Sequence, residues 1–225
     1  MKHINTYITE KLKISNKKTK HTLFPTNTDE LVEMILMEIK QNGNECSLNH
    51  IDTSKITDMY ELFYNLDFNG DISEWDVSNV TTMKYMFEYS KFNGDISEWD
   101  VSSVTDMGAM FYQSEFNGDI FQWNVSNVEN MGSMFSYCSF NGDISGWDVR
   151  NVKNMSYMFD GSKFNGNISE WNVSNVEDMI SMFRESEFNA DISNWKINNN
   201  CKTTYMFYKC DIKDDYKPFK NGKRL

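Results

Sequence analysis

The tryptophans of this chain recur with a fixed step of 24 residues, and no insertion or deletion interrupts the series. The six positions are Trp75, Trp99, Trp123, Trp147, Trp171 and Trp195. Six phenylalanines keep the same step, at Phe68, Phe92, Phe116, Phe140, Phe164 and Phe188. A period between about 20 and 50 residues is typical of one supersecondary unit stacked on copies of itself. The sequence therefore predicts one elongated repeat array.

Each copy of the unit divides into two apolar patterns. Residues 72–80, with Ile-x-x-Trp-x-Val-x-x-Val, have the spacing of a leucine-rich-repeat strand. Thr82 is a suitable helix N-cap, and the run Met-x-x-Met-Phe at 83–87 predicts a single helical turn. The glycine that follows each turn, such as Gly94, is expected to supply a positive φ. The predicted fold class is a repeat solenoid of the leucine-rich-repeat type, with parallel β-strands on one face and short helical turns on the other.

An amphipathic helix is predicted before the repeats, over residues 28–42. Leu31, Ile35 and Ile39 fall on one face, Thr28 is a suitable N-cap, and Gly43 is placed to end the helix. We expect this helix to cover the open end of the first repeat as an N-terminal cap. The predicted organisation is a basic arm and capping helix over residues 1–50, the solenoid over 51–210, and a basic C-terminal tail over 211–225.

The net charge of −11 is unevenly distributed along the chain. Both ends are rich in lysine, so the body between them is strongly acidic and is expected to repel nucleic acid and anionic membranes. No run of 18 or more apolar residues predicts a membrane span, and the amino terminus lacks the apolar core of a secretory signal. These features favour a cytoplasmic or virion-associated protein.

The residue types that carry catalysis are sparse. The four cysteines show no pairing framework and are expected to be reduced, partly buried thiols, and all three histidines precede the repeats. No nucleophile elbow, phosphate-binding glycine loop or zinc-binding motif occurs. We therefore expect no enzyme activity, no cofactor and no metal. The recurring asparagines are expected to form a turn ladder that bonds backbone groups, which we prefer to a calcium loop. Their positions are Asn69, Asn93, Asn117, Asn141, Asn165 and Asn189.

At the run Asp95-Ile-Ser-Glu-Trp-Asp-Val101 and the run Met83-Lys-Tyr-Met-Phe87, the chain resembles the BspA-like leucine-rich-repeat surface proteins. It is most similar to their mycoplasma-type lipoprotein repeat, F-N-x-D-I-S-x-W-D-V-S-x-V-x-x-M-x-x-M-F. The similarity covers about residues 52–210. It implies a right-handed solenoid and a role in surface adhesion or host contact. The chain has no lipobox cysteine, so a cell-surface location rests on the resemblance alone.

Four acidic residues form the first candidate binding site. Glu74, Asp76, Glu98 and Asp100 occupy outward strand positions of an expected concave face. At a strand spacing of about 4.8 Å these carboxylates repel one another unless a cation or a basic partner neutralises them. One interpretation is an acidic surface for a basic protein segment. The other is a solvated face that keeps the protein soluble.

Three tyrosines form the second candidate site. Tyr112 shares its repeat position with Tyr64 and Tyr208, and Tyr89 shares the next position with Tyr137. Tyrosine on a rigid scaffold gives a large contact area at a small entropy cost, which favours Tyr89, Tyr112 and Tyr137 as interface residues. Alternatively, the rings cover gaps between the helical turns.

The function predicted from the sequence is a non-catalytic protein–protein interaction or adhesion module that presents an extended solenoid surface. Its expected partner is a protein, which a basic surface would suit. The alternative is a structural or accessory component of a bacteriophage or viral particle, favoured by the missing signal and the basic ends.

Overall fold

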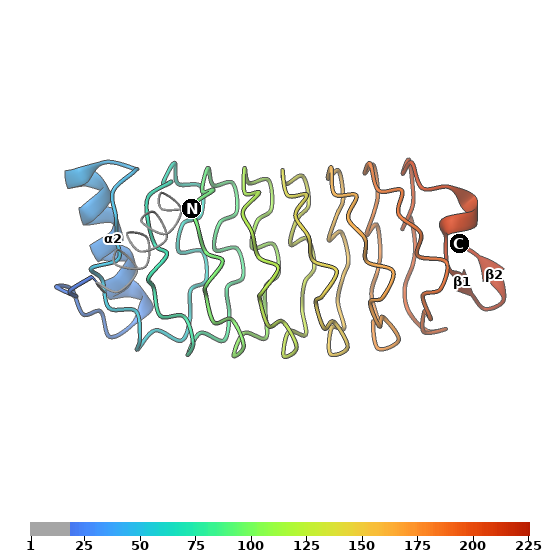
Figure 1. Cartoon of the computed structure of the whole chain (residues 1–225), viewed down its shortest axis with the longest axis horizontal. Coiled ribbons are helices and arrows are strands. Elements are labelled where there is room, and N and C mark those ends of the chain that lie inside the picture. Colours follow the sequence, from blue (N-terminus) through green and yellow to red (C-terminus); the bar gives the residue numbers. More distant parts are fainter. Residues whose placement is uncertain (1–18) are drawn as a thin grey trace, which may run out of the picture.

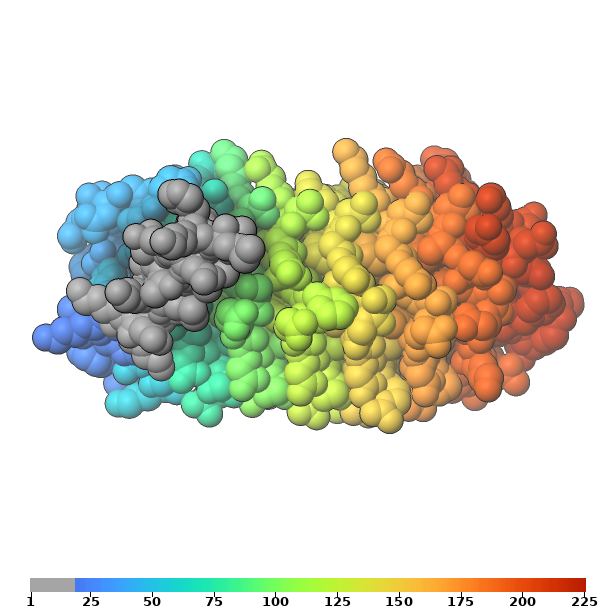
Figure 2. Space-filling model, in the orientation of Figure 1, coloured from blue at the N-terminus to red at the C-terminus, as the bar shows by residue number. Residues whose placement is uncertain are grey.

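The structure is a computed structural model in which residues 19–225 are described. Figure 1 shows similar coils stacked along the long axis, with a helix at the amino-terminal end and a short hairpin at the other. The regular elements of the described part are α2 (Thr28–Asn42), the 3-10 helix η1 (Asp214–Tyr216), β1 (Phe219–Lys220) and β2 (Lys223–Arg224). In the space-filling view the coils follow one another from blue to red as an elongated body (Figure 2).

Neighbouring coils are joined by parallel bridges between equivalent residues, 24 positions apart. We number the coils by the residue at this bridge. The first to seventh coils contain Asp58, Thr82, Asp106, Asn130, Asn154, Asp178 and Lys202, respectively.

The prediction of a β-strand over residues 72–80 is wrong, because the structure has no strand there. The backbone there makes two local turns, in which the Trp75 N–H donates to the Ile72 carbonyl at 3.2 Å and the Val80 N–H donates to the Val77 carbonyl at 2.9 Å. Each turn is capped by an aspartate: Asp76 accepts from the Ser78 N–H at 3.0 Å. Such local side-chain bonds offer the backbone an alternative to a ladder with its neighbour.

The prediction of a helical turn over residues 83–87 is also wrong. The residue predicted as the N-cap nevertheless bonds the backbone as a capping side chain does. Asp106 accepts from the Gly108 N–H at 2.8 Å, as a capping side chain does. A helix does not follow, because Tyr85 and Tyr89 have φ values of 60° and 56°. The Met86 N–H closes a local turn onto Met83, whereas the Tyr85 N–H donates to Gly108 of the next coil at 3.0 Å. The segment is a ribbon of turns whose alternate N–H groups bond the next coil.

The glycines of the Phe-Asn-Gly-Asp corners do not supply the positive φ expected of them. Positive-φ glycines of the described part are Gly43, Gly161 and Gly222. At Gly94, an added Cβ would lie 2.8 Å from the Phe92 ring. The Phe92 ring lies against the Gly94 Cα, which favours glycine here, although the last copy has Ala190 at this position.

Aromatic columns fill the interior of the stack. The rings of the column that contains Phe87 and Phe111 are 5.3–5.9 Å apart from coil to coil. The column that contains Phe92 and Phe116 has a longer step of 6.2–6.4 Å. Each repeat tryptophan is buried and donates its Nε1–H to an isoleucine or leucine carbonyl in the preceding coil, at 3.0–3.2 Å. The apolar core is therefore continuous from end to end. The distance between rings of neighbouring coils is shortest in the column beside the ribbon of turns.

The asparagine ladder predicted from the sequence is confirmed. The side chain of Asn69 accepts from the backbone N–H of Asn93, and Asn93 accepts from Asn117, each at 2.8 Å. The series continues to Asn189, which accepts from the N–H of Lys213 at 3.0 Å. These bonds satisfy one backbone donor per coil.

Helix α2 lies where the sequence predicted a helix, and Gly43 ends it with a φ of 86°. Leu31 and Ile35 are buried in the same cluster as the first coils, and Ile39 packs partly against it. The predicted N-cap is wrong by one residue. Asn27 accepts from the Glu30 N–H at 3.0 Å, and the Thr28 hydroxyl instead donates to the Asp58 carbonyl of the first coil.

The C-terminal segment 211–225, predicted as a basic tail, is ordered in the structure. Its η1 and its β1–β2 hairpin lie against the last coils. The Ile192 N–H donates to the Tyr216 carbonyl at 3.0 Å, and Phe219 forms a parallel bridge with Lys196. Ile212 is buried, so the segment covers the open end of the core.

Candidate functional site

The four candidate acids are exposed, and two of them serve backbone turns. Asp76 and Asp100 accept from the N–H groups of Ser78 and Ser102, at 3.0 and 3.1 Å. The bonds from Ser102 hold the pKa of Asp100 below its ordinary value. These local bonds account for aspartate at this position without any partner.

Glu74 has a different neighbour: its carboxylate accepts from the backbone N–H of Thr19 at 2.8 Å. The sequence placed all four acids on a concave strand face. The structure forms no strand there, and the adjacent tryptophan column has a long step, 6.5 Å between Trp75 and Trp99. Within residues 19–225, none of the four acids makes an ion pair with another side chain.

The three candidate tyrosines lie on the ribbon of turns. We define the turn face as the outward side chains of this ribbon, at positions 84, 85, 88 and 89 of the second coil and at their equivalents in the other coils. Tyr89 and Tyr137 are 41% and 44% exposed. Tyr89 makes edge contacts with Tyr64 at 5.9 Å and with Tyr112 at 5.4 Å. Burial and the nearby Tyr112 raise the pKa of Tyr89, so its hydroxyl remains neutral at physiological pH. The structure therefore joins Tyr64, Tyr89 and Tyr112 into one ridge.

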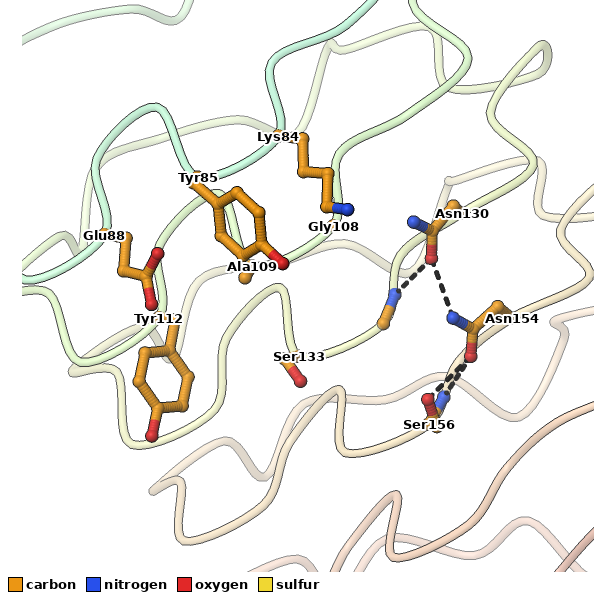
Figure 3. A pocket seen from close by; sticks show the side chains of 11 residues that line it. Lys84, Tyr85, Glu88, Gly108, Ala109, Tyr112, Asn130, Ser133, Asn154 and Ser156 are labelled. Carbon is orange, nitrogen blue, oxygen red and sulfur yellow. Dashed lines mark hydrogen bonds between the residues drawn. The ribbon is translucent and has the colours of Figure 1, made fainter. Parts of the chain in front are cut away.

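A groove of about 280 Å³ lies beside this ridge on the turn face (Figure 3). Its floor is made of small residues in the third and fourth coils, namely Gly108, Ala109, Gly132 and Ser133. Its N-terminal end is formed by Lys84, Tyr85 and Glu88, one side by Tyr112, and the opposite side by Asn130, Asn154 and Ser156. Coils on both sides carry larger residues at the floor positions, so the hollow interrupts an otherwise filled surface.

The asparagines of the groove belong to a polar chain that crosses coils. Asn130 donates to Asp106 at 2.8 Å, and Asn154 donates to Asn130 at 2.9 Å. Each of these amides has a second N–H for which the described residues offer no acceptor. The groove thus has fixed amide donors along one side.

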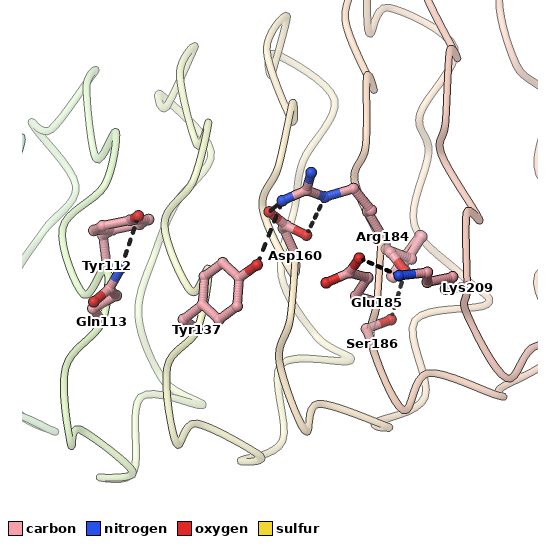
Figure 4. Close-up of polar contacts among 9 residues, drawn as sticks. Tyr112, Gln113, Tyr137, Asp160, Arg184, Glu185, Ser186 and Lys209 are labelled. Carbon is pink, nitrogen blue, oxygen red and sulfur yellow. Dashed lines mark hydrogen bonds and ion pairs between the residues drawn. The ribbon is translucent and has the colours of Figure 1, made fainter.

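An ion pair joins the fifth and sixth coils on the turn face (Figure 4). Arg184 donates from Nε and Nη2 to the two carboxylate oxygens of Asp160, both at 2.8 Å, and from Nη2 to the Tyr137 hydroxyl at 3.4 Å. The hydrogen bonds with Asp160 raise the pKa of Arg184, which stays charged. Asp160 is buried, and the Tyr137 ring lies where a Cβ on Gly161 would be, 2.3 Å away. The pair therefore fixes Tyr137 against the next two coils.

Comparison with known proteins identifies the repeat. Residues 30–139 and 114–219 each match the family described as "Mycoplasma protein of unknown function, DUF285". The chain belongs to this family. The mycoplasma-type repeat predicted from the sequence is thereby confirmed, and the two successive matches make the chain a tandem-repeat protein. No curated protein and no solved structure matches it.

In this DUF285 chain, the groove and the Arg184–Asp160 pair are features that sequence reasoning missed. A signal for both exists in the repeat alignment. Asp160 and Arg184 are opposite charges at one repeat position, 24 residues apart. Gly108 and Gly132 stand in successive copies where the second coil has Lys84. Comparing outward positions column by column would have shown both, once the outward positions were known.

The described part of this DUF285 chain shows neither a membrane span nor a metal centre. Within residues 19–225, no helix has the length and apolar character needed to cross a bilayer. No group of three or more His, Cys, Asp or Glu side chains in the same residues is arranged to hold a metal ion. The Asp71 carboxylate accepts from the N–H and hydroxyl of Ser73 at 3.0 and 2.7 Å.

All four cysteines are free thiols, as the sequence predicted, and Cys138 and Cys201 are buried. Burial raises the pKa of Cys138 to about 11, and it also raises the pKa of Cys201 to about 11. The thiolate is the reactive form of cysteine, so both groups are poor nucleophiles. Their role is to fill the core.

The buried Cys138 thiol predicts a loss of stability at high pH. In the unfolded chain the thiol ionises near its ordinary pKa of 9.0, whereas in the folded chain it stays protonated up to about 11. Between these values the folded state binds more protons, so stability falls as pH rises. Denaturant melts at pH 8 and pH 10.5 should show a larger loss for the wild type than for Cys138→Ala. Equal losses in the two proteins would contradict the assignment.

Proposed function

We propose that this DUF285 chain is a non-catalytic protein-binding module, a repeat solenoid that holds its partner on the turn face. The observation that supports this most strongly is the tyrosine ridge of Tyr64, Tyr89 and Tyr112, with Tyr137 beyond it. Tyr64 and Tyr89 are exposed, Tyr112 is half-buried, and their edge contacts at 5.4–5.9 Å offer broad amphipathic area with little rotamer freedom to lose on binding.

The backbone under the ridge supports the same proposal. Tyr89 and Tyr137 have φ values of 56° and 52°, in the left-handed region. The same φ recurs at Gln113 and Glu185, so it belongs to the repeat and is not strain stored at one site. The Tyr89 N–H also donates to the Tyr112 carbonyl at 2.9 Å, and the Asn65 N–H donates to the Glu88 carbonyl at 2.8 Å, so the backbone at Tyr89 is bonded to both adjacent coils. A rigid base of this kind lowers the entropy cost of binding.

Variation between copies also favours the turn face. The inward methionine, phenylalanine and tryptophan positions hardly change along the array, whereas the outward positions of the turn face hold Tyr, Lys, Glu, Gly, Ser and Arg. An array whose only task was to stay folded and soluble needs no such asymmetry. We place binding here and not at Glu74, Asp76, Glu98 and Asp100, because Asp76 and Asp100 are used by local turns. The BspA-like resemblance implies a more specific version of this proposal, in which the module acts in surface adhesion.

Selection from a random peptide library tests the proposal without knowledge of the partner. The folded chain should enrich peptides that no longer bind a Tyr89→Ala/Tyr112→Ala/Tyr137→Ala variant. The matched control is Phe121→Ala, which removes an aromatic ring that is 40% exposed and lies outside the turn face. The peptides should bind this control as they bind the wild type. Failure to enrich any peptide, or peptides that bind the triple variant equally well, would rule out the turn face as the binding surface.

A further inference from the structure

The groove beside the tyrosine ridge has dimensions that restrict what can occupy it. Its lining extends from Lys84 in the second coil to Ser156 in the fifth, so it runs along the axis of the stack. Coils joined by backbone bonds are about 4.8 Å apart, which makes these three steps about 14 Å long. A volume of about 280 Å³ over that length suits a single extended segment and is too small for a helix, whose diameter with side chains is about 10–12 Å.

The tyrosines next to the groove repeat at every second coil. Tyr64 and Tyr112 share one position, and Tyr89 and Tyr137 share the next, each pair 48 residues apart. The distance along the axis between every second coil is about 9.6 Å. A polyproline II helix repeats every three residues at about 3.1 Å per residue, which is about 9.3 Å per turn. A segment in this conformation, lying along the axis, would present the same side to successive tyrosines.

The hydrogen-bonding groups of the groove match a backbone that has acceptors and few donors. Proline has no N–H, so a proline-rich segment offers mainly carbonyl oxygens. The groove supplies donors: the hydroxyls of Tyr85, Tyr112 and Ser133, and the free amide N–H groups of Asn130 and Asn154. Glu88 is the one lining residue that, when ionised, can only accept.

The N-terminal end of the groove carries Lys84, whose Nζ lies over the Tyr85 ring at 4.8 Å from its centroid, and the carboxylate of Glu88, with Glu61 nearby. The two carboxylates outnumber the lysine, which favours a cation on the ligand. Glu88 and Glu61 repel each other, and burial together with this repulsion raises the pKa of Glu88. Among residues 19–225, neither carboxylate has a lysine or arginine partner in an ion pair. The rings of Tyr64 and Tyr89 lie in the first and second coils, as Glu61 and Glu88 do, and aromatic faces attract cations. A basic side chain at this end would relieve the repulsion and pack on a ring.

We propose that the groove binds a proline-rich segment in the polyproline II conformation, with a lysine or arginine at the end that reaches Glu61 and Glu88. This inference rests on the proposed function and names the partner chemistry of the same face. The prolines pack against the tyrosine ridge, and their carbonyls accept from the asparagine side of the groove.

Fluorescence anisotropy with labelled synthetic peptides tests the inference on the full chain. The probes are nine prolines with one arginine, placed at either end, ten prolines without arginine, and a glycine–serine peptide that keeps the arginine. At least one arginine–proline peptide should bind, more tightly than ten prolines, while the glycine–serine peptide should not. Tyr89→Ala and Tyr112→Ala should each weaken binding about tenfold or more, as loss of an aromatic anchor does. Tyr205→Ala, outside the groove, should leave it unchanged.

Charge is tested separately with Glu88→Gln. This variant should weaken the arginine–proline peptide severalfold at low salt and much less at 1 M salt, where charges are screened beyond about 3 Å. Its affinity for ten prolines should not change. Failure of every proline peptide to bind would overturn the inference, as would binding that ignores both tyrosine substitutions. If the library selection still yields turn-face peptides without proline, the inference fails and the proposed function stands. If it yields none, both fail.

Discussion

Replacing Trp123 by alanine is expected to lower the free energy of unfolding by about 3–5 kcal/mol, the usual cost of truncating a large buried aromatic residue. Trp123 is 3% exposed at the middle of the array. Its Nε1–H donates to the Ile96 carbonyl of the preceding coil at 3.0 Å. The substitution therefore opens a cavity and removes a bond between coils. Denaturant melts followed by circular dichroism measure the loss.

The matched control for Trp123 lies in the same coil. Phe121 is also aromatic, but it is 40% exposed and its ring lies over Gly146 at the surface. Phe121→Ala should cost less than about 1 kcal/mol, as surface substitutions usually do. A loss below about 1 kcal/mol for Trp123→Ala, or equal losses for the two variants, would show that the tryptophan column does not carry the core.

The repeat period and the composition of the core were predictable from the sequence, because burial follows the apolar pattern directly. The local backbone conformation was not predictable in this way. The spacing of residues 72–80 fits a leucine-rich-repeat strand, but it equally fits two turns, and the bonds from Ser73 and Ser78 to their aspartates decide for turns. Spacing alone cannot distinguish these cases, since both direct the same apolar residues inward.

The ribbon of turns could not be predicted from the sequence for a different reason. A type II turn requires positive φ at its third residue, and glycine or asparagine is the usual signal there. Here Tyr85, Ala109 and Ser133 occupy that position, with φ values of 60°, 52° and 57°. Left-handed conformation at such residues costs roughly 1–2 kcal/mol each. Bonds to both adjacent coils, such as that from Tyr85 to Gly108, offset this cost, and they exist only in the stack.

For the candidate sites, exposure was predictable and contacts were not. The acids and the tyrosines were expected on the surface, and they are there. That Tyr89 meets both Tyr64 and Tyr112 depends on the turn conformation, which brings two adjacent repeat positions of neighbouring coils together. The glycines show the same limit, since the Phe92 ring, and not a positive φ, favours glycine at position 94.

Removing the buried face of α2 is expected to have the second large effect. Leu31 and Ile35 are 0% and 1% exposed and belong to the same apolar cluster as Ile51 and Met59 of the first coil. Leu31→Ala/Ile35→Ala should cost about 2–5 kcal/mol for each residue, provided that the helix remains docked. If α2 detaches, the end of the core is open to water, and an exposed apolar surface of this kind promotes association. Melts and light scattering measure the two effects.

The same helix supplies the control for the cap. Leu36 and Met37 are 46% and 51% exposed on the other side of α2, so Leu36→Ala/Met37→Ala removes similar apolar volume without touching the core. Alanine has the best helix propensity, so neither double variant weakens the helix itself. The inward variant should lose stability and form oligomers, while the outward variant should stay monomeric. Two equally stable, monomeric variants would mean that α2 does not close the array. The first coil would then have to be stable on its own, although each coil buries its apolar side chains mainly against its neighbours.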